Sequence, residues 1–244
     1  MREQAKINKI AWEHRADEFL DVRAGGSLAE VAAKMKEKSQ VRDDFHKKYF
    51  ANVDGKKIAN PCGSDGRASI PLALLGANVT IFDISEPFQR YTLEVAKEAG
   101  VSIQYILGDF CETDCTKYGN MFDIVYSEGG ILHYFSDINV FMKTIYAITK
   151  PGGQFILSDY HPFRKTGNNS DYFDTQLHER KVPCRGHFPE DEQDSFPKMM
   201  IRYYNLSEII NAVISPGFTL TEFLEHPSPD NEKFPGGFTI IAKK

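Results

Sequence analysis

The sequence has few cysteines, and no pattern pairs them. Four occur among 244 residues, with a spacing that matches neither a zinc site nor a disulfide framework. They are Cys62, Cys111, Cys115 and Cys184. No apolar run approaches the ~20 residues of a membrane span, and the N-terminus is charged from its second residue. We therefore expect reduced thiols, no bound metal, no membrane or secretory segment, and a cytoplasmic protein.

An excess of positive charge is also missing. The chain has 29 Lys and Arg against 34 Asp and Glu, a net charge of −5, and its lysine-rich patches at 34–38 and 47–48 are interrupted or flanked by acids. A nucleic-acid-binding surface needs a basic patch or stripe, so we expect no nucleic-acid partner. The hydrophobic content of 41% is that of an ordinary soluble globular protein. Monomer and homodimer both remain open.

What the sequence does contain is a regular alternation of strand and helix patterns after residue 55. The predicted strands are 57–60, 79–82, 102–107, 122–127 and 154–158. The predicted helices are 67–75, 86–99, 138–149 and 207–214, with a turn at 150–153. This alternation predicts an α/β fold with a doubly wound, parallel sheet. Two more strands, 218–225 and 238–242, follow each other without a helix and predict an antiparallel edge.

Two segments lie outside this alternation. Residues 1–52 are charged and have helical periodicity, which predicts an N-terminal helical cap on a domain that spans 53–244. In residues 160–204 the alternation of strand and helix patterns stops, and Tyr and Phe side chains occur among polar residues. A long insertion of this kind is usually functional, so we expect it on the substrate side of the domain.

The first loop of the alternation and the end of the second strand point to a nucleoside site. The loop is Gly63-Ser64-Asp65-Gly66, and the second strand ends at Asp83. A parallel pair with a crossover helix brings both to one sheet edge, where backbone N–H groups and a carboxylate suit an adenosine-containing ligand. Each feature alone has a plain structural interpretation, as a tight turn or a solvated strand end. Their order and separation favour the site.

Four stretches resemble class I S-adenosylmethionine-dependent methyltransferases, specifically the small-molecule branch of type 11. They are Ile58–Gly66 with Asp83, Gly108–Phe110, Phe122–Phe135 and Lys150–Asp159. The resemblance covers roughly residues 55 to 160, and the C-terminal strand pair fits the same family's reversed last hairpin. It implies a Rossmann-like sheet of seven mostly parallel strands with an antiparallel last strand, and S-adenosylmethionine as the cofactor.

The resemblance also implies roles for individual residues. The first loop would wrap the methionine part of the cofactor, mainly through main-chain groups. Asp83 would hold the ribose hydroxyls, Ile84 would pack on the adenine, Asp109 would accept the adenine amino group, and Phe110 would offer its N–H to the ring. Ser127 and Glu128 would lie close to the sulfonium. The loop residues concerned are Asn60, Pro61, Cys62, Gly63, Ser64 and Gly66.

The chain departs from the family pattern at two turns. Asn60 stands where an acidic residue is usual, and Pro61 stands where a glycine is usual. The first loop is one residue longer than usual, and so is the segment Glu128-Gly129-Gly130. These departures change individual contacts, but backbone groups supply much of the binding in such a loop.

Methyl transfer to a nitrogen or oxygen nucleophile is an in-line displacement, in which a base removes the acceptor's proton. Two histidines follow strand ends on the ligand side, His133 after the fourth strand and His161 after the fifth. Each also has a structural interpretation, His133 as a satisfied imidazole at a helix start and His161 as a loop anchor. We take His161, His133, Glu128 and Tyr160 as catalytic candidates.

The methyl acceptor is expected to be a small molecule that lies in a pocket under residues 160–204. Trp12 is either a core anchor of the cap or a wall of the pocket, and Tyr134 is either a wall or a packing residue. Arg164 is either a binder of an anionic acceptor or a surface charge. The substrate candidates are Trp12, Tyr134, Arg164, Tyr172 and Tyr203.

Two other classes of function remain open. A nicotinamide-dependent oxidoreductase on a related fold would have a fuller glycine fingerprint and a catalytic Tyr-Lys or similar pair near strand four or five, and the sequence has neither. A non-catalytic nucleoside-binding scaffold would keep the pocket without the chemistry. Asp83 and Asp109, together with the aromatic insertion, argue against it.

Overall fold

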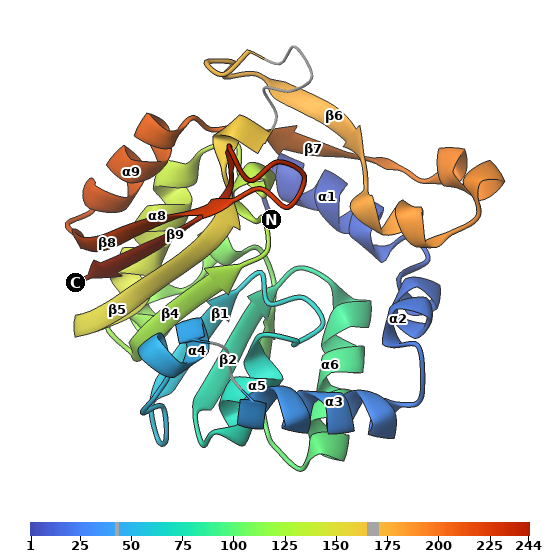
Figure 1. The fold of residues 1–244 in the computed structure, drawn as a ribbon, viewed down its shortest axis with the longest axis horizontal. Helices are drawn as coiled ribbons and strands as arrows, with labels where there is room; N and C mark the ends of the chain where they lie inside the picture. The colour runs from blue at the N-terminus through green and yellow to red at the C-terminus, as the bar shows by residue number, and fades with distance from the viewer. Residues whose placement is uncertain (42–43, 165–170) are drawn as a thin grey trace.

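The centre of the molecule is a seven-stranded sheet in the order β3-β2-β1-β4-β5-β9-β8 (Figure 1). The structure, a computed structural model, describes residues 1–41, 44–164 and 171–244. The first five strands are parallel, and β9 runs antiparallel to both β5 and β8. The strands are β1 (Lys57–Pro61), β2 (Asn78–Asp83), β3 (Gln104–Leu107), β4 (Phe122–Glu128), β5 (Thr149–Tyr160), β8 (Thr219–Pro227) and β9 (Pro235–Lys243). The predicted Rossmann-like sheet is confirmed.

Helices cover both faces of the sheet, and each face has its own hydrophobic core. Successive side chains of a strand point to opposite faces, so Ile58 packs on one side of β1 and Ala59 on the other. The core that includes Ile58 lies under α3 (Leu28–Val41), α4 (Asp44–Tyr49), α5 (Ser69–Leu74) and α6 (Glu86–Ala99). The core that includes Ala59 lies under α7 (Cys115–Tyr118), α8 (Ile138–Ile148) and α9 (Leu206–Ile214).

The start of β5 differs from the prediction. Residues 150–153 were predicted as a turn before the fifth strand, but β5 already begins at Thr149. Phe122 pairs with Thr149, and the next pair is Ile124 with Gln154, so the extra residues of β5 form a bulge in the ladder. Pairing with β4 holds this glycine-rich stretch as strand, and local sequence signals do not report that pairing.

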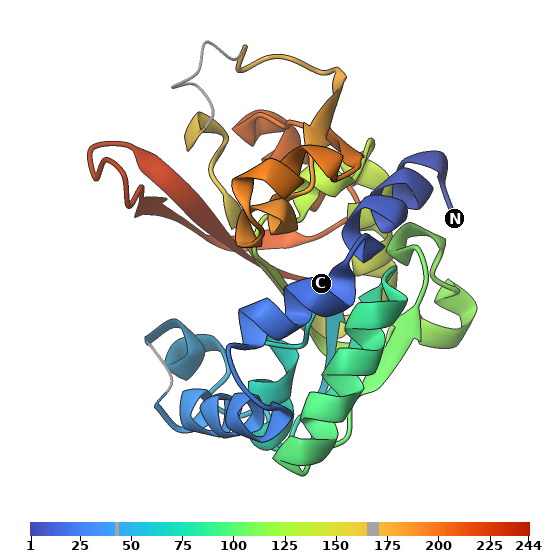
Figure 2. The same cartoon turned by 90° about the vertical axis from the view of Figure 1, so that its right-hand side faces the viewer.

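The N-terminal segment and the insertion meet on one side of the molecule. The segment begins with α1 (Glu3–Glu13) and α2 (Ala16–Ala24), and the insertion contains the hairpin β6 (Leu177–Lys181) and β7 (Lys198–Arg202). Asn8 on α1 exchanges hydrogen bonds with the backbone of Met200 on β7. Figure 2 shows the blue helices α1 and α2 beside the orange insertion. The helix α3, by contrast, packs against α6 on the sheet.

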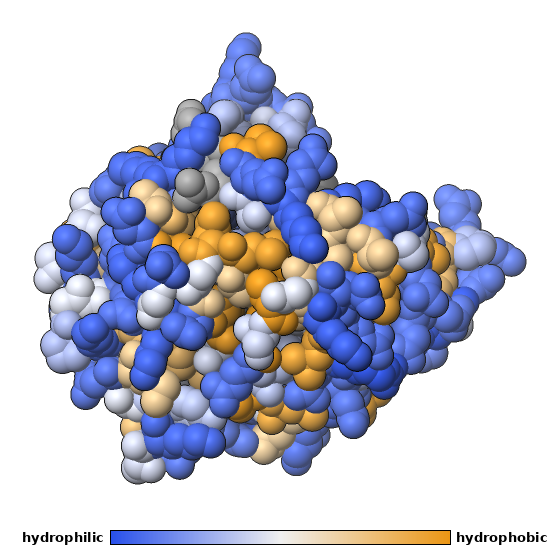
Figure 3. All heavy atoms as spheres, turned by 90° about the horizontal axis from the view of Figure 1, so that it is seen from below, coloured by the Kyte–Doolittle hydropathy of each residue, from blue (hydrophilic) through white to orange (hydrophobic). Residues whose placement is uncertain are grey.

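Two short 3-10 helices, η4 (Pro183–His187) and η5 (Glu190–Ser195), link β6 to β7. Seen from below, the surface carries polar and charged side chains around an apolar area at its centre (Figure 3). Within the described ranges, no helix combines the length and the apolar character that crossing a bilayer requires.

Candidate active site

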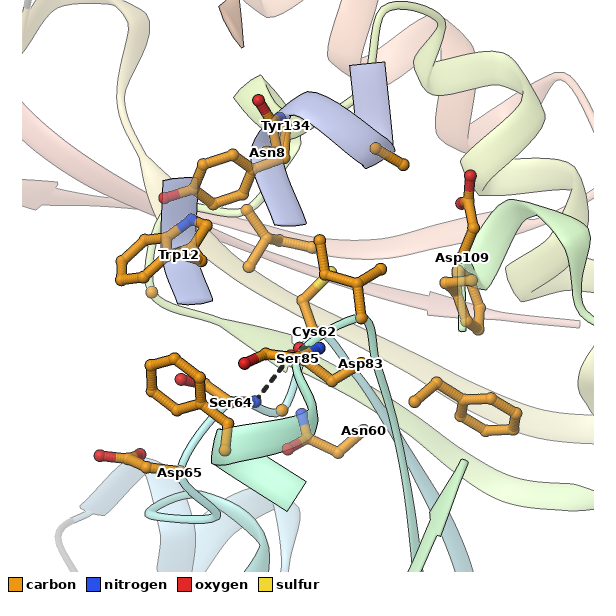
Figure 4. Close-up of a pocket in the computed structure, with 18 of the residues that line it drawn as sticks. Asn8, Trp12, Asn60, Cys62, Ser64, Asp65, Asp83, Ser85, Asp109 and Tyr134 are labelled. Atoms are coloured by element: carbon orange, nitrogen blue, oxygen red, sulfur yellow. Dashed lines mark hydrogen bonds between the residues drawn. The ribbon is translucent and has the colours of Figure 1, made fainter. Parts of the chain in front are cut away.

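The loop after β1 is tied to the end of β2 by the carboxylate of Asp83. The N–H of Ser64 donates to Oδ2 of Asp83 at 2.9 Å, and the N–H of Ser85 donates to Oδ1 at 3.1 Å (Figure 4). Cys62 and Ser64 have positive φ angles of 56° and 50° although neither is a glycine. Each such conformation costs about 1–3 kcal/mol and is typical of functional loops. The predicted meeting of first loop and second strand end is present.

Burial raises the pKa of Asp83, and its hydrogen bonds from Ser64 and Ser85 offset this only in part. Because the pKa is raised on folding, the contribution of this group to stability is present at low pH and is lost as the carboxyl ionises. Above that pKa the carboxylate therefore destabilises the ligand-free fold. Further donors, such as two ribose hydroxyls, would relieve that cost.

A cavity of about 280 Å³ opens in front of these groups, at the carboxyl ends of the strands. Asp109 lies at one end of it and Asp65 at the other, with Asp83 and Ser85 between them (Figure 4). Of the sequence candidates, eleven line this cavity. They are Trp12 from the cap, Asn60, Cys62, Gly63, Ser64, Asp83, Ile84, Asp109, Phe110, Glu128 and Tyr134.

Two observations show that this cavity suits a polar ligand close to the backbone. Nothing lies within 4 Å of the place where a Cβ would project from Gly108 or Gly129, and both glycines line the cavity. Ser85 also lines it and is 1% exposed, and its Oγ has no hydrogen-bond partner in the described part of the chain. A buried hydroxyl without a partner is costly, so a ligand that bonds to it gains affinity. An adenosine-containing cofactor fits these residues.

Three of the predicted cofactor residues lie behind the cavity wall. Pro61, Gly66 and Ser127 are not among its lining residues, because each supports the loops from behind. The hydroxyl of Ser127 donates to the carbonyl of Pro61 at 3.2 Å, and Ser127 is fully buried. A Cβ on Gly66 would come 2.6 Å from Cγ2 of Thr92, so this glycine permits close packing of the loop on α6.

Asn60 reaches the cavity, but its amide bonds to the protein. Its Nδ2 donates to the carbonyl of Tyr126 at 2.7 Å, and its Oδ1 accepts from the hydroxyl of Ser69 at 2.7 Å. Asn60 therefore joins β1, β4 and the start of α5. This neutral bridge occupies the position where the resemblance calls for an acidic residue.

The carboxylate of Asp109 accepts most of its hydrogen bonds from Arg2, the second residue of the chain. The backbone N–H and Nε of Arg2 donate to Oδ2 at 3.1 and 2.8 Å, while Nη2 of Arg2 and the N–H of Cys111 donate to Oδ1 at 2.9 and 3.1 Å. Burial raises the pKa of Asp109, but the hydrogen bonds and charge of Arg2 outweigh it and hold the pKa below its usual value. A carboxylate has about four acceptor positions, and all are used here.

The cap closes the cavity with aromatic side chains. The ring of Trp12 on α1 lies 6.1 Å from that of Phe88 on α6 and 6.1 Å from that of Tyr134, edge-to-face in both cases. Glu128 accepts a short hydrogen bond from the hydroxyl of Tyr126. Trp12 is thus both a packing residue and a wall of the cavity, and Tyr134 is a wall beside it.

The remaining predicted site residues gather around a second cavity, of about 400 Å³. They are His133, Tyr160, His161, Arg164, Tyr172 and Tyr203. The loop after β4 separates the two cavities, because Gly129, Ile131 and Tyr134 line the first while Leu132 and His133 line the second. The short helix η2 (Leu132–Tyr134) turns neighbouring side chains to different sides.

His161 is held in place on both sides of its ring. Its Nδ1 accepts the N–H of Phe163 at 3.2 Å, and its Nε2 lies 3.0 Å from Oε1 of Glu225. The residue is 1% exposed. Burial lowers its pKa more than Glu225 raises it, so the pKa lies below that of an ordinary histidine. These contacts fit the loop-anchor interpretation, although the ring also borders the second cavity.

Several residues that line the first cavity could not be predicted from the sequence. Arg2 and Asn8 come from the charged N-terminal segment, Arg23 from α2 and Ser85 from the turn after β2. Arg2 is 107 residues away from Asp109, and no periodicity links them. Ser85 could have been predicted only from its place two residues after Asp83, at the strand end that meets the first loop.

The comparisons with known proteins agree with this geometry. Residues 61–157 match the family model of a methyltransferase domain. No curated protein matches the chain. An S-adenosylmethionine-dependent methyltransferase from Mesorhizobium loti is 20% identical, with a TM-score of 0.62, and the alignment covers 79% of this chain and 92% of that one.

Two further solved structures align over nearly the whole chain. Magnesium protoporphyrin IX methyltransferase from Synechocystis, with bound S-adenosylhomocysteine, has a TM-score of 0.65 at 15% identity and covers 99% of this chain and 100% of that one. An S-adenosylmethionine-dependent methyltransferase from Clostridium acetobutylicum has a TM-score of 0.62 at 15% identity, with coverage of 94% and 97%. Residues 61–157 therefore match a methyltransferase domain, in a chain that has the fold of S-adenosylmethionine-dependent methyltransferases of known structure.

Proposed function

We propose that the protein transfers a methyl group from S-adenosylmethionine to a nitrogen or oxygen nucleophile of a small molecule. The observation that carries this is the first cavity, which joins the loop of a matched methyltransferase domain to the half-buried carboxylate of Asp83. When bound, S-adenosylmethionine supplies a methyl group activated by its positively charged sulfur. In this proposal the acceptor is not a nucleic acid, and the protein acts in the cytoplasm as a monomer or homodimer.

The cavity residues would hold the cofactor in a fixed orientation. Asp83 accepts the ribose hydroxyls, Ile84 packs on the adenine, and the backbone of Cys62 and Ser64 wraps the methionine part. Ser85 offers its unpartnered Oγ to the same ligand. Fixed orientation matters because positioning supplies as much as ~7–11 kcal/mol of the acceleration of a group transfer.

The aromatic cap would keep water out of this cavity. Trp12, Phe88 and Tyr134 form a contiguous wall over it. Glu128 lines the cavity from the carboxyl end of β4. Electrostatic interactions are stronger in a site from which water is excluded. The carboxylate of Glu128 would therefore favour the positively charged end of the cofactor.

Arg2→Gln should raise the affinity for S-adenosylhomocysteine about tenfold. All acceptor positions of Asp109 are used, two of them by the Arg2 guanidinium, so an adenine amino group must displace that guanidinium to reach the carboxylate. When a ligand binds only a minor conformation of the protein, its apparent affinity is reduced in proportion to the fraction of molecules in that conformation. Calorimetric titration of the variant and the wild type measures the change.

Lys6→Gln is the matched control for Arg2→Gln, because Lys6 is an exposed cation on α1 whose partner is Glu3, on the same helix. Its affinity should equal that of the wild type. An unchanged or lower affinity in Arg2→Gln would show that Arg2 stays on Asp109 while the cofactor binds. The adenine amino group would then have another partner.

The activity itself is tested by incubating the protein with methyl-labelled S-adenosylmethionine and a pool of small metabolites. We expect label in a small-molecule product whose formation stops when excess S-adenosylhomocysteine is added. Saturable binding of S-adenosylhomocysteine without any labelled product would support a non-catalytic scaffold and would contradict the proposal.

A further inference from the structure

The second cavity concentrates arginines in a chain whose net charge is negative. Arg164, Arg180 and Arg202 all line it, while the chain as a whole carries a net charge of −5. Arg202 is paired with Glu208 at 2.6 Å. Within residues 1–41, 44–164 and 171–244, no carboxylate pairs with Arg164 or Arg180. Among the described residues, the guanidinium groups of Arg164 and Arg180 therefore border this cavity without an ion-pair partner.

The two acidic residues that line the cavity, Asp159 and Asp171, accept hydrogen bonds from backbone N–H groups. Asp159 accepts the N–H groups of Ile131 and Leu132 on Oδ2, at 3.0 and 2.9 Å, and that of Tyr160 on Oδ1. Asp171 accepts the N–H of Phe173 at 2.8 Å. Hydrogen bonds from backbone N–H groups hold a carboxylate in a fixed orientation. In the described part of the chain, neither carboxylate forms an ion pair with Arg164 or Arg180.

Aromatic rings support the same arginines. The guanidinium of Arg164 lies 4.2 Å from the centre of the Tyr160 ring, and Nε of Arg180 donates to the hydroxyl of Tyr203 at 3.2 Å. Tyr172 completes the wall. Arginine in a fixed fork recognises a carboxylate or phosphate through two parallel hydrogen bonds, and tyrosine faces bind flat rings. Together they form a pocket for a ring that carries an anion.

We propose that this cavity binds the methyl acceptor, and that the acceptor is an aromatic molecule with a carboxylate or phosphate group. The anion meets Arg164 and Arg180, and the ring lies against the tyrosines. This inference rests on the proposed function for the identity of the ligand as an acceptor. It adds the chemical class of the acceptor, and the part of the insertion that selects it.

The loop between the cavities places such an acceptor next to the cofactor site. Gly129 and Tyr134 face the first cavity, His133 faces the second, and the ring of Tyr160 packs directly on Gly130. A Cβ on Gly130 would come 2.2 Å from Cε2 of Tyr160, so only glycine permits this contact. An acceptor anchored at the arginines therefore lies on the other side of this loop from the cofactor, and its nucleophile must pass the loop to meet the methyl group.

The test compares matched anionic and neutral ligands on protein saturated with S-adenosylhomocysteine. The probes are 1-naphthoate, 1-naphthyl phosphate and the uncharged 1-naphthamide, each titrated by calorimetry. At least one anion should bind tenfold or more tightly than the amide. Arg164→Gln and Arg180→Gln should each remove at least fivefold of that affinity, while Arg164→Lys should retain part of it. Binding of inorganic phosphate as tightly as the aromatic anions would overturn the role of the rings.

Arg90→Gln is the matched control, because Arg90 is an exposed cation on α6 that pairs with Asp17 and does not line the cavity. It should bind all probes as the wild type does. Equal binding of anion and amide, or anion binding that both cavity variants leave unchanged, would overturn the inference while S-adenosylhomocysteine binding stays intact. Failure of S-adenosylhomocysteine to bind would instead contradict the proposed function, and the anion titration remains readable without it.

Discussion

Asp83→Ala should lower the affinity for S-adenosylhomocysteine about 100-fold. The carboxylate is positioned by the N–H groups of Ser64 and Ser85, and each of its oxygens has room for a further donor. Hydrogen bonds to a charged group contribute about 1.5–3 kcal/mol each, and 1.4 kcal/mol is a factor of ten in affinity. Losing two ribose hydroxyl contacts should therefore lower the affinity by two orders of magnitude or slightly more. Calorimetric titration gives the dissociation constants.

The same substitution also releases the first loop, and a ligand analogue separates the two effects. An S-adenosylhomocysteine analogue that lacks both ribose hydroxyls should bind the wild type weakly, and the further loss of affinity for it in Asp83→Ala measures the release of the loop alone. Such a cycle isolates the interaction between the carboxylate and the hydroxyls. Glu94→Gln, an exposed charge on α6, should behave as the wild type. Equal affinity of Asp83→Ala and the wild type for the complete ligand would reject this placement of the ribose.

Replacing the catalytic base should lower kcat about 100-fold and leave cofactor affinity unchanged, because a general base contributes ~10²–10⁴ to the rate. The two candidates are His133 and His161, which line the same cavity. The Nδ1 of His161 accepts the N–H of Phe163, so only its Nε2, which lies 3.0 Å from Oε1 of Glu225, is available to take a proton. The measurement is methyl transfer by His133→Asn and His161→Asn at saturating cofactor.

A pH profile distinguishes a base from a structural histidine. Loss of the base should remove the acid limb of the kcat profile, whereas loss of a loop anchor should lower kcat at every pH and shift Tm. For His161, whose pKa is below the ordinary value because of burial, the neutral form dominates at pH 7. If neither variant lowers kcat, the acceptor needs no histidine base, and the acid–base assignment is wrong.

The sheet could be predicted because its signals are local. Each of the first strands carries a run of apolar residues, and the crossover helices have clear periods and glycine ends such as Gly100. The topology then follows from general rules for parallel sheets. The hairpin β6–β7 was not predicted, since His178, Glu179 and Arg180 give no strand signal. Pairing with β7 and packing of β7 on α1 form that strand.

The site was predictable only where topology dictates it. Asp83 and the first loop meet because parallel strands with a crossover helix end at one edge. Arg2 was missed because it reaches Asp109 across 107 residues through a cap whose docking the sequence does not encode locally. His133 and Tyr134 are neighbours in sequence but line different cavities, and only the turn between them decides which side chain faces which.

The central claim is that an adenosine-containing sulfonium cofactor occupies the cavity between the first loop, Asp83 and the helical cap. Calorimetric titration of the intact protein with S-adenosylhomocysteine, and separately with NAD, tests it most directly. We predict saturable binding of about one S-adenosylhomocysteine per chain and no binding of NAD. Saturable binding of NAD with none of S-adenosylhomocysteine would contradict the claim, and with it the residue roles assigned to this cavity.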